Sequence, residues 1–195
     1  MADVAIEALG AEPSDAARPP VSAAFGPKVK AFDDAVDDLF DRARGKTIAD
    51  RIMYGASAVG DFSLIWQIAS VVRALRGGER EAVRLSVALA AESALINVGV
   101  KSLFRRTRPA WEQPRPRGLR RPRSSSFPSG HATSGFMAAT LLATGRPRSR
   151  LFWFALAAVV ASSRVHVKIH HASDVAAGAL IGVGLGRMVR KIWPL

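Results

Sequence analysis

The chain has 195 residues, enough for one domain with a buried core. Its hydrophobic residues make up 49% of it while its formal net charge is +12, a pairing more typical of membrane proteins with basic loops than of soluble nucleic-acid-binding proteins. The absence of cysteine excludes disulfide bonds and a zinc–thiolate site. Residues 1–50 carry ten acids and six bases, whereas residues 51–195 carry 22 bases and six acids, so the basic body follows an acidic N-terminal segment.

The N-terminal segment divides into two parts. Residues 1–27 are rich in Ala, Pro, Glu and Asp and lack the pattern of a signal peptide, which predicts a disordered tail. Residues 28–50 have the spacing of an amphipathic helix. Its apolar face would hold Phe32, Val36, Leu39 and Phe40. Its acidic face would hold Asp33, Asp34, Asp37, Asp38 and Asp41, and this face is either solvated or packed on the basic body or a second subunit.

Apolar stretches alternate with basic segments from residue 51 onward. The stretches cover about 52–72, 85–100, 132–145, 151–163 and 175–189. Only the first reaches the roughly 20 residues that a membrane-spanning helix needs, and the others require flanking Arg and Lys to extend toward the membrane surface. Their succession predicts an all-α fold, an integral membrane bundle of about five transmembrane helices over residues 51–195.

Two features inside these stretches need explanation. Gly178, Gly182 and Gly186 recur every four residues, a spacing that lets helices approach closely in lipid. Asp61 and Glu92 are costly in a membrane unless they are paired or face a wet cavity. One interpretation has Glu92 steadying an Arg or Lys near the site.

The most polar segment runs from Lys101 to Ser126 and carries eight arginines, one lysine and one acid. Its prolines exclude a regular helix in the middle. Such a segment could bind nucleic-acid phosphates, but its one central aromatic, Trp111, gives little support for base stacking. An anionic headgroup or a phosphate ester fits equally well, and we expect a lipid phosphate and the membrane as partners, without nucleic acid.

Three short motifs carry the chemistry. Lys101, Arg108 and Arg164 could clamp a phosphoryl group, because catalysis of phosphoryl transfer is mostly positioning and charge stabilisation. Ser129, Gly130 and His131 precede an apolar stretch, where a helix start could bind an anion and His131 could protonate a leaving oxygen.

The last motif pairs a histidine with a carboxylate. His170 and Asp174 are four residues apart and share one face of a helix, so the carboxylate could fix the imidazole tautomer and free the other nitrogen to attack. His171 and Asp174, three residues apart, could do the same. The spacing leaves both pairs open.

Together the motifs read K-x6-R-P, P-S-G-H and S-R-x5-H-x3-D. This pattern resembles that of the type 2 phosphatidic acid phosphatase (PAP2) family, whose site is shared with vanadium haloperoxidases and bacterial acid phosphatases, and every fixed position is present. The resemblance covers about residues 50–192 and implies a helical membrane phosphatase that forms a phosphohistidine.

The resemblance also implies roles. His170 would be the nucleophile, Asp174 would orient it and His131 would be the general acid. Phosphate would be held by Lys101, Arg108, Ser129, Gly130 and Arg164. His166 and His171 have no place in the motif, and no metal or cofactor is implied.

The leading interpretation is a phosphatase acting on a lipid phosphate or diphosphate: phosphatidic acid, phosphatidylglycerol phosphate, or a polyprenyl phosphate or diphosphate, the polyprenyl class being preferred. The alternatives are a non-catalytic basic membrane or nucleic-acid-binding protein that keeps the motif, and a vanadium haloperoxidase. Basic residues fall on both sides of the predicted bundle, so the positive-inside rule does not orient it. Family precedent favours a site facing away from the cytoplasm, and a homo-oligomer stays open.

Overall fold

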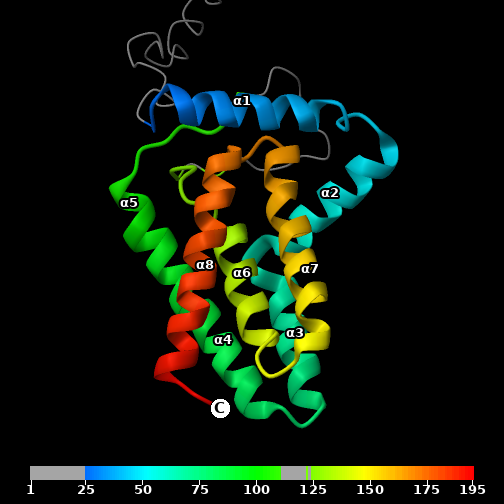
Figure 1. The fold of residues 1–195 in the computed structure, drawn as a ribbon, viewed down its shortest axis with the longest axis vertical. Coiled ribbons are helices and arrows are strands. Elements are labelled where there is room, and N and C mark those ends of the chain that lie inside the picture. The colour runs from blue at the N-terminus through cyan, green and yellow to red at the C-terminus, as the bar shows by residue number, and fades with distance from the viewer. Residues whose placement is uncertain (1–24, 111–121, 123) are drawn as a thin grey trace, which may run out of the picture.

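The computed structural model describes residues 25–110, 122 and 124–195, and helices without any strand make up this part of the chain (Figure 1). The all-α prediction is therefore confirmed for the described residues, whereas the predicted tail lies almost wholly outside them. The elements are α1 (Pro27–Asp41), α2 (Thr47–Gly60), η3 (Asp61–Ser63), α3 (Leu64–Leu75), α4 (Glu79–Ala94), η4 (Leu95–Val100, a π-helical turn), α5 (Lys101–Leu103), α6 (Gly130–Leu142), α7 (Pro147–His166) and α8 (Ala172–Ile192).

Local sequence explains several helix ends. Pro27 and Pro147 stand in the first turns of α1 and α7, where the missing N–H costs nothing. Gly77 adopts a φ of 78° directly after the last turn of α3, a left-handed conformation that glycine reaches without steric cost. Leu95–Val100 continues α4 into α5, so Glu79–Leu103 is one helical run.

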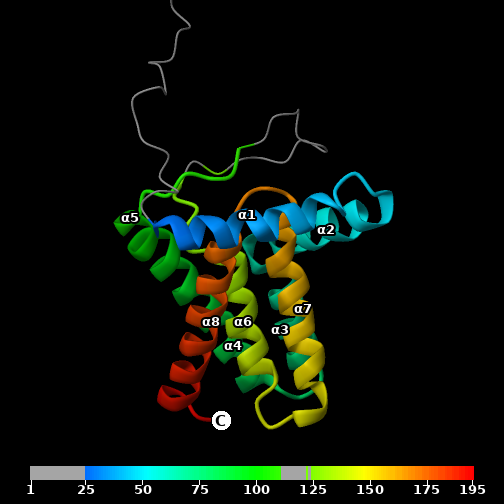
Figure 2. The same ribbon diagram turned by 45° about the horizontal axis from the view of Figure 1, so that its top comes forward.

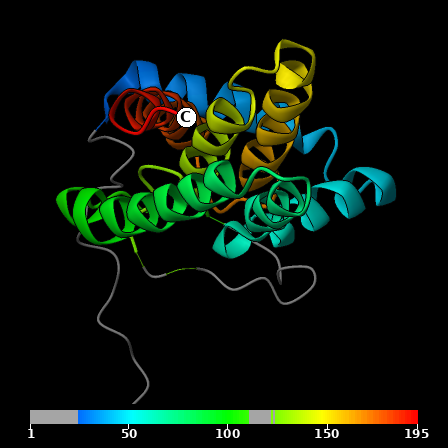
Figure 3. The same ribbon diagram turned by 90° about the horizontal axis from the view of Figure 1, so that it is seen from below.

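Helix α6 forms the centre of the bundle. Seen from below in Figure 3, it lies between α8 and α7, and α4 and α3 pass along its remaining side. Trp66, Leu85, Met137 and Val160 are among the fully buried core residues contributed by four different helices. The central position of α6 places its N-terminal residues, Gly130 and His131, where these helices converge.

All five predicted apolar stretches form helices, but they differ in length. Three helical runs are long and apolar enough to cross a membrane: Thr47–Leu75, Glu79–Leu103 and Ala172–Ile192. Helix α6 has 13 residues, or about 20 Å at 1.5 Å per residue, which is shorter than a hydrocarbon core. The structure thus supports a membrane fold, while the count of five spans stays a prediction.

The spaced glycines of α8 face α6. A Cβ added at Gly182 would lie 2.3 Å from the backbone oxygen of Thr133, and one at Gly178 would lie 2.6 Å from that of Ser129. Gly184, on another face of the helix, has nothing within 4 Å of such an atom. The close approach that the sequence pattern indicated therefore brings α8 into backbone contact with α6.

Helix α1 differs from its prediction in length and in its packed face. It ends at Asp41 instead of reaching residue 50, because a turn containing Gly45, with a φ of 80°, separates it from α2. Figure 2 shows α1 lying across one end of the bundle. Phe32 and Leu39 are exposed while Asp33 is buried, so part of the acidic face packs on the basic body, and the amphipathic character of this helix stays a prediction. Ion pairs with the body explain this orientation: Asp33 binds Arg106, and both Asp37 and Asp41 lie within 4 Å of Lys168.

Candidate active site

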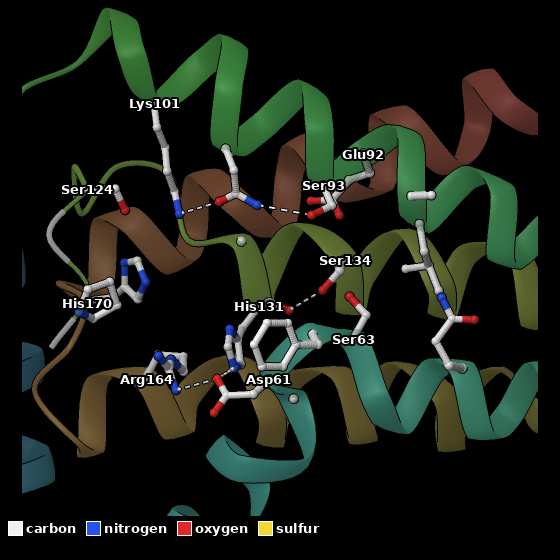
Figure 4. Close-up of a pocket in the computed structure, with 18 of the residues that line it drawn as sticks. Asp61, Ser63, Glu92, Ser93, Lys101, Ser124, His131, Ser134, Arg164 and His170 are labelled. Carbon is white, nitrogen blue, oxygen red and sulfur yellow. Dashed lines mark hydrogen bonds and ion pairs between the residues drawn. The ribbon is translucent and has the colours of Figure 1, made fainter. Parts of the chain in front are cut away.

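A cavity of about 870 Å³ lies between α4, α6 and the junction of α2 with α3 (Figure 4). It brings together six of the eight predicted site residues: Lys101, Arg108, Gly130, His131, Arg164 and His170. Asp174 lies behind His170, and Ser129 is fully buried at the start of α6, so neither is among the residues that line the cavity. Two acids that the predicted site did not include, Asp61 and Glu92, do line it.

The ring of His170 is oriented by its neighbours. The Arg108 Nη1 lies 3.3 Å from His170 Nε2 and also donates to the carbonyl of Ile169 at 2.9 Å. A guanidinium can only donate, so Nε2 must be the unprotonated nitrogen and the proton sits on Nδ1. Nδ1 faces Asp174 at 3.7 Å, an ion-pair distance longer than a hydrogen bond. Burial lowers the pKa of His170 to about 3, which keeps the imidazole neutral and Nε2 available as a nucleophile.

The carboxylate of Asp174 is held from two sides. Its Oδ2 accepts a hydrogen bond from the backbone N–H of His171 at 2.9 Å, and its Oδ1 accepts one from Arg106 Nη1 at 2.5 Å. The backbone carbonyl of Asp174 accepts from the N–H of Ser129 at 3.1 Å, which joins the starts of α8 and α6. Asp174 is therefore fixed both to the loop after α7 and to the start of α6.

Arg106 extends this arrangement to α1. Its Nη2 donates to Asp33 Oδ2 at 2.5 Å, and Asp33 also accepts from the N–H and hydroxyl of Ser173, at 2.8 and 2.9 Å. Both Asp33 and Arg106 are at most 5% exposed. Attraction to the two carboxylates offsets much of the cost of removing the Arg106 guanidinium from water. Through this guanidinium, α1 is tied to the carboxylate beside His170.

His131 is positioned by the junction of α2 with α3. Its Nε2 lies 3.2 Å from the carbonyl of Ser57 and 3.1 Å from Asp61 Oδ1. Both neighbours are acceptors, so Nε2 carries a proton and Nδ1 is the nitrogen left for a substrate. Gly60 makes room for the ring, since a Cβ there would lie 2.5 Å from His131 Cδ2.

The backbone at this junction is strained. Phe62 and Ser63 have φ values of 53° and 57°, in the left-handed region that residues with a Cβ rarely occupy. Such residues cost about 1–3 kcal/mol each and persist where surrounding structure holds them. The turn brings Asp61 to His131 and within 3.9 Å of Arg164 Nη1, which in turn donates to the hydroxyl of Ser57.

The cations converge on the same space. Figure 4 shows Lys101 and Arg164 on opposite sides of the cavity near His170. Lys101 Nζ donates to Asn97 Oδ1 at 2.9 Å and lies 3.9 Å from where a Cβ on Gly130 would be. With Arg108, these side chains present three positive groups around one volume, an arrangement suited to the oxygens of a phosphoryl group.

The other motif residues have different surroundings. The Ser129 hydroxyl is buried and has no hydrogen-bond partner among the described residues, and Ser129 is not among the residues that line the cavity. His166 is fully buried and pairs with Asp50 Oδ1 at 2.8 Å, while His171 lies 3.2 Å from the carbonyl of Thr107. These contacts fit structural roles for both histidines outside the cavity.

Sequence reasoning did not place Asp33, Asp61 or Arg106 around the site. For Asp61 a signal existed, because an acid inside an apolar stretch usually faces a cavity or a partner. Arg106 lies two residues before Arg108 among several arginines, and nothing in its spacing distinguishes it. Asp33 was one of five clustered acids.

Comparison with known proteins shows the family to which this sequence belongs. The model of the PAP2 superfamily matches residues 81–194, more than half of the chain. The chain belongs to the PAP2 superfamily. The match includes all eight predicted site residues, whereas Asp61 and Asp33 precede it.

PAP2 relatives agree in sequence and in fold. The decaprenylphosphoryl-5-phosphoribose phosphatase of Mycobacterium tuberculosis is 34% identical over 142 residues, covering 71% of this chain and 77% of the relative. The crystal structure of Aquifex aeolicus LpxE aligns with a TM-score of 0.66 at 24% identity, covering 80% of this chain and 93% of that one. A transmembrane PAP2-type phosphatidylglycerolphosphate phosphatase from Bacillus subtilis aligns with a TM-score of 0.67 at 21% identity, covering 88% and 89%. The prediction of a PAP2-type membrane phosphatase is confirmed at this level.

Proposed function

We propose that this PAP2 protein hydrolyses a phosphate monoester or diphosphate carried by a membrane lipid, through a phosphohistidine on His170. The observation that carries the proposal is that His170 Nε2, held as an acceptor by Arg108, shares a cavity with His131 and two further cations. A polyprenyl-linked lipid is the preferred class, since the M. tuberculosis relative is named for a decaprenyl-linked phosphate. Phosphatidic acid and phosphatidylglycerol phosphate are the other candidates.

In the first step, His170 Nε2 forms a bond to phosphorus while the bond from phosphorus to the lipid oxygen breaks. His131 donates a proton to that oxygen, which leaves as an alcohol. The phosphorylated ring keeps its proton on Nδ1, where Asp174 stabilises the positive charge. Lys101, Arg108 and Arg164 stabilise the charge on the phosphoryl oxygens.

In the second step, water attacks phosphorus and the bond to His170 breaks. His131, now neutral, accepts the proton of this water, and inorganic phosphate is released. Asp61 supports both steps because its carboxylate next to His131 Nε2 stabilises the imidazolium that donates and is regenerated.

We propose that this chemistry needs no metal ion. Protein cations surround the phosphate position, and among the described residues no group of three His, Cys, Asp or Glu side chains is arranged to hold a metal. Activity should therefore survive EDTA. Loss of activity in EDTA that is restored by a divalent cation would contradict this part of the proposal.

The direct test is phosphate release by detergent-purified protein from decaprenylphosphoryl-5-phosphoribose, phosphatidic acid, phosphatidylglycerol phosphate and a polyprenyl diphosphate. Wild type should release phosphate from at least one of them, and His170→Ala should not. His171→Gln is the matched control, because His171 neighbours His170 in sequence but is not among the described residues that line the cavity. Release by His170→Ala at the wild-type rate would rule out the proposed nucleophile.

An inhibitor and a substitution test the phosphate clamp independently. Vanadate should inhibit, because its adduct with His170 resembles the transition state. Arg164→Lys should lower kcat/KM, since lysine cannot bind two oxygens with one planar group. Near-normal activity in Arg164→Lys would remove this side chain from the clamp.

We also propose that α6 and α7 complete a bundle of five membrane helices and that the site faces away from the cytoplasm. The cysteine-free chain makes the orientation measurable with introduced thiols. A membrane-impermeant thiol reagent added to intact cells should label Lys46→Cys, between α1 and α2, and not Ser149→Cys, at the opposite end of the bundle. The reverse pattern would place the site in the cytoplasm.

A further inference from the structure

The cavity is larger than a phosphoryl group requires, and its two ends differ. In Figure 4, His170, Lys101 and Arg164 lie toward one end, His131 and Asp61 in the middle, and Glu92 with Ser63 and Ser134 toward the other. Glu92 precedes Lys101 by nine residues on one helical run that includes the π-helical turn η4. The second end is therefore polar without being cationic.

Glu92 is a buried acid without a close ion-pair partner among the described residues. Its side chain lies inside the candidate span Glu79–Leu103 and the residue is 4% exposed, yet Oε1 has no hydrogen-bond partner among the described residues. No ion pair within 4 Å joins Glu92 to another described side chain, although Glu92 and Lys101 attract each other electrostatically over a longer distance. A buried, unsatisfied carboxyl costs free energy, and intramembrane acids usually serve a ligand or a transport path.

The order of His170, His131 and Glu92 along the cavity indicates which part of a substrate would reach Glu92. In an in-line displacement the leaving oxygen departs opposite the attacking nitrogen. His170 lies at one end and His131, which protonates the leaving oxygen, lies between His170 and Glu92 (Figure 4). The alcohol that leaves therefore extends from His131 toward Glu92.

The chemistry of Glu92 selects among alcohols. A hydrocarbon chain at this position would leave the carboxyl unsatisfied. A hydroxyl group both donates and accepts, so it pairs with a carboxyl in either protonation state. Ser63 and Ser134 add two hydroxyls on the same side.

We propose that Glu92, with Ser63 and Ser134, forms a subsite for the hydroxyl groups of the leaving alcohol, so that the scissile phosphate is carried on a sugar or another polyol. This inference rests on the phosphatase function proposed above and narrows its substrate class. Within that class, a lipid-linked sugar and a glycerol headgroup present the same chemistry at Glu92.

The test compares kcat/KM for three substrates in wild type, Glu92→Gln and Glu92→Ala. Decaprenylphosphoryl-5-phosphoribose carries free sugar hydroxyls, phosphatidylglycerol phosphate carries one glycerol hydroxyl, and phosphatidic acid has none on its diacylglycerol. Wild type should prefer a hydroxylated substrate, and the better of the two identifies sugar or glycerol. Glu92→Ala should lower kcat/KM for that substrate by about tenfold or more and leave phosphatidic acid within about twofold, because only the hydroxylated substrate loses a hydrogen bond at this position. Glu92→Gln keeps a donor and an acceptor, so its kcat/KM for the hydroxylated substrate should lie between those of wild type and Glu92→Ala.

Glu79→Gln is the matched control, because Glu79 is an exposed acid at the start of the same helix. A preference of wild type for phosphatidic acid would overturn the subsite, and so would Glu92 variants that lower all three activities equally or none. In each of these cases wild type still releases phosphate, so the proposed function stands. Failure of wild type to release phosphate from any of the three would overturn the function and the subsite together.

Discussion

Asp33 and Asp174 bind opposite nitrogens of one guanidinium, that of Arg106, each at 2.5 Å. The first belongs to α1, outside the part of the chain that matches the family, and the second stands beside the proposed nucleophile. All three side chains are at most 5% exposed. A helix at the edge of the molecule therefore takes part in fixing the carboxylate of the proposed nucleophile pair.

Asp33→Asn should lower kcat. The change leaves Arg106 with one carboxylate and frees it to pull Asp174 away from His170, and we expect about a tenfold loss, equivalent to about 1.4 kcal/mol in the barrier. KM should change little because Asp33 is distant from the phosphate clamp. Asp34→Asn is the control, since Asp34 is exposed and pairs with Lys30 on the surface. Equal kinetics in the two variants would show that α1 does not position the site.

Gly182→Ala should destabilise the protein. The new methyl group would lie 2.3 Å from a backbone oxygen of α6, which a side-chain rotation cannot relieve, so α6 and α8 must separate. Overpacking of this kind costs about 1–3 kcal/mol. Gly184→Ala adds the same methyl group to the same helix with nothing within 4 Å. Thermal unfolding in detergent should show a lower Tm for the first variant alone, and matching Tm values would contradict the close contact.

Asp61→Asn should slow protonation of the leaving group. Without the carboxylate, the imidazolium of His131 is less stable, and we expect about a hundredfold loss in kcat on an alkyl phosphate, within the range of general acid catalysis. An aryl ester such as p-nitrophenyl phosphate needs no proton on its leaving oxygen. Its turnover should fall much less, and an equal loss on both esters would mean that Asp61 acts on something other than the general acid.

Burial of His170 makes stability depend on pH. The folded pKa of about 3 lies below the ordinary value of 6.5, so between these values the unfolded chain binds the extra proton. The contribution of neutral His170 to the free energy of unfolding is fully present above pH 6.5. It declines by up to about 1.4 kcal/mol per pH unit as the pH falls toward 3. Tm should therefore drop between pH 7 and pH 5, and drop less in His170→Gln. The same pH dependence in wild type and variant would assign the effect to other groups.

Much of the site was predictable because its chemistry lies in short motifs. Lys101, Arg108, His131, Arg164 and His170 meet in one cavity, and the glycines of α8 face α6 as their spacing indicated. The convergence of the motif residues was expected from the resemblance to the PAP2 family, whereas the shared face of the glycines follows from helical spacing alone.

The long-range contacts were not predictable in the same way. Asp33 could equally have been solvated, and its burial depends on Arg106 arriving from a segment far along the chain. The turn at Phe62 and Ser63 has no glycine or proline at its left-handed positions, so nothing local marked the kink that brings Asp61 to His131. Gly45 did mark the end of α1, and the length assigned to that helix overlooked it.

The glycine face of α8 has a consequence for how this protein tolerates change. Because the glycines of α8 lie against backbone atoms of α6 and the N–H of Ser129 donates to the carbonyl of Asp174, main-chain contacts help to set the spacing between Asp174 and the start of α6. The outward side of α8, which includes the exposed Leu180 and Met188, contributes nothing to that spacing. Substitutions there can follow the thickness and composition of a host membrane while the reacting groups keep their places.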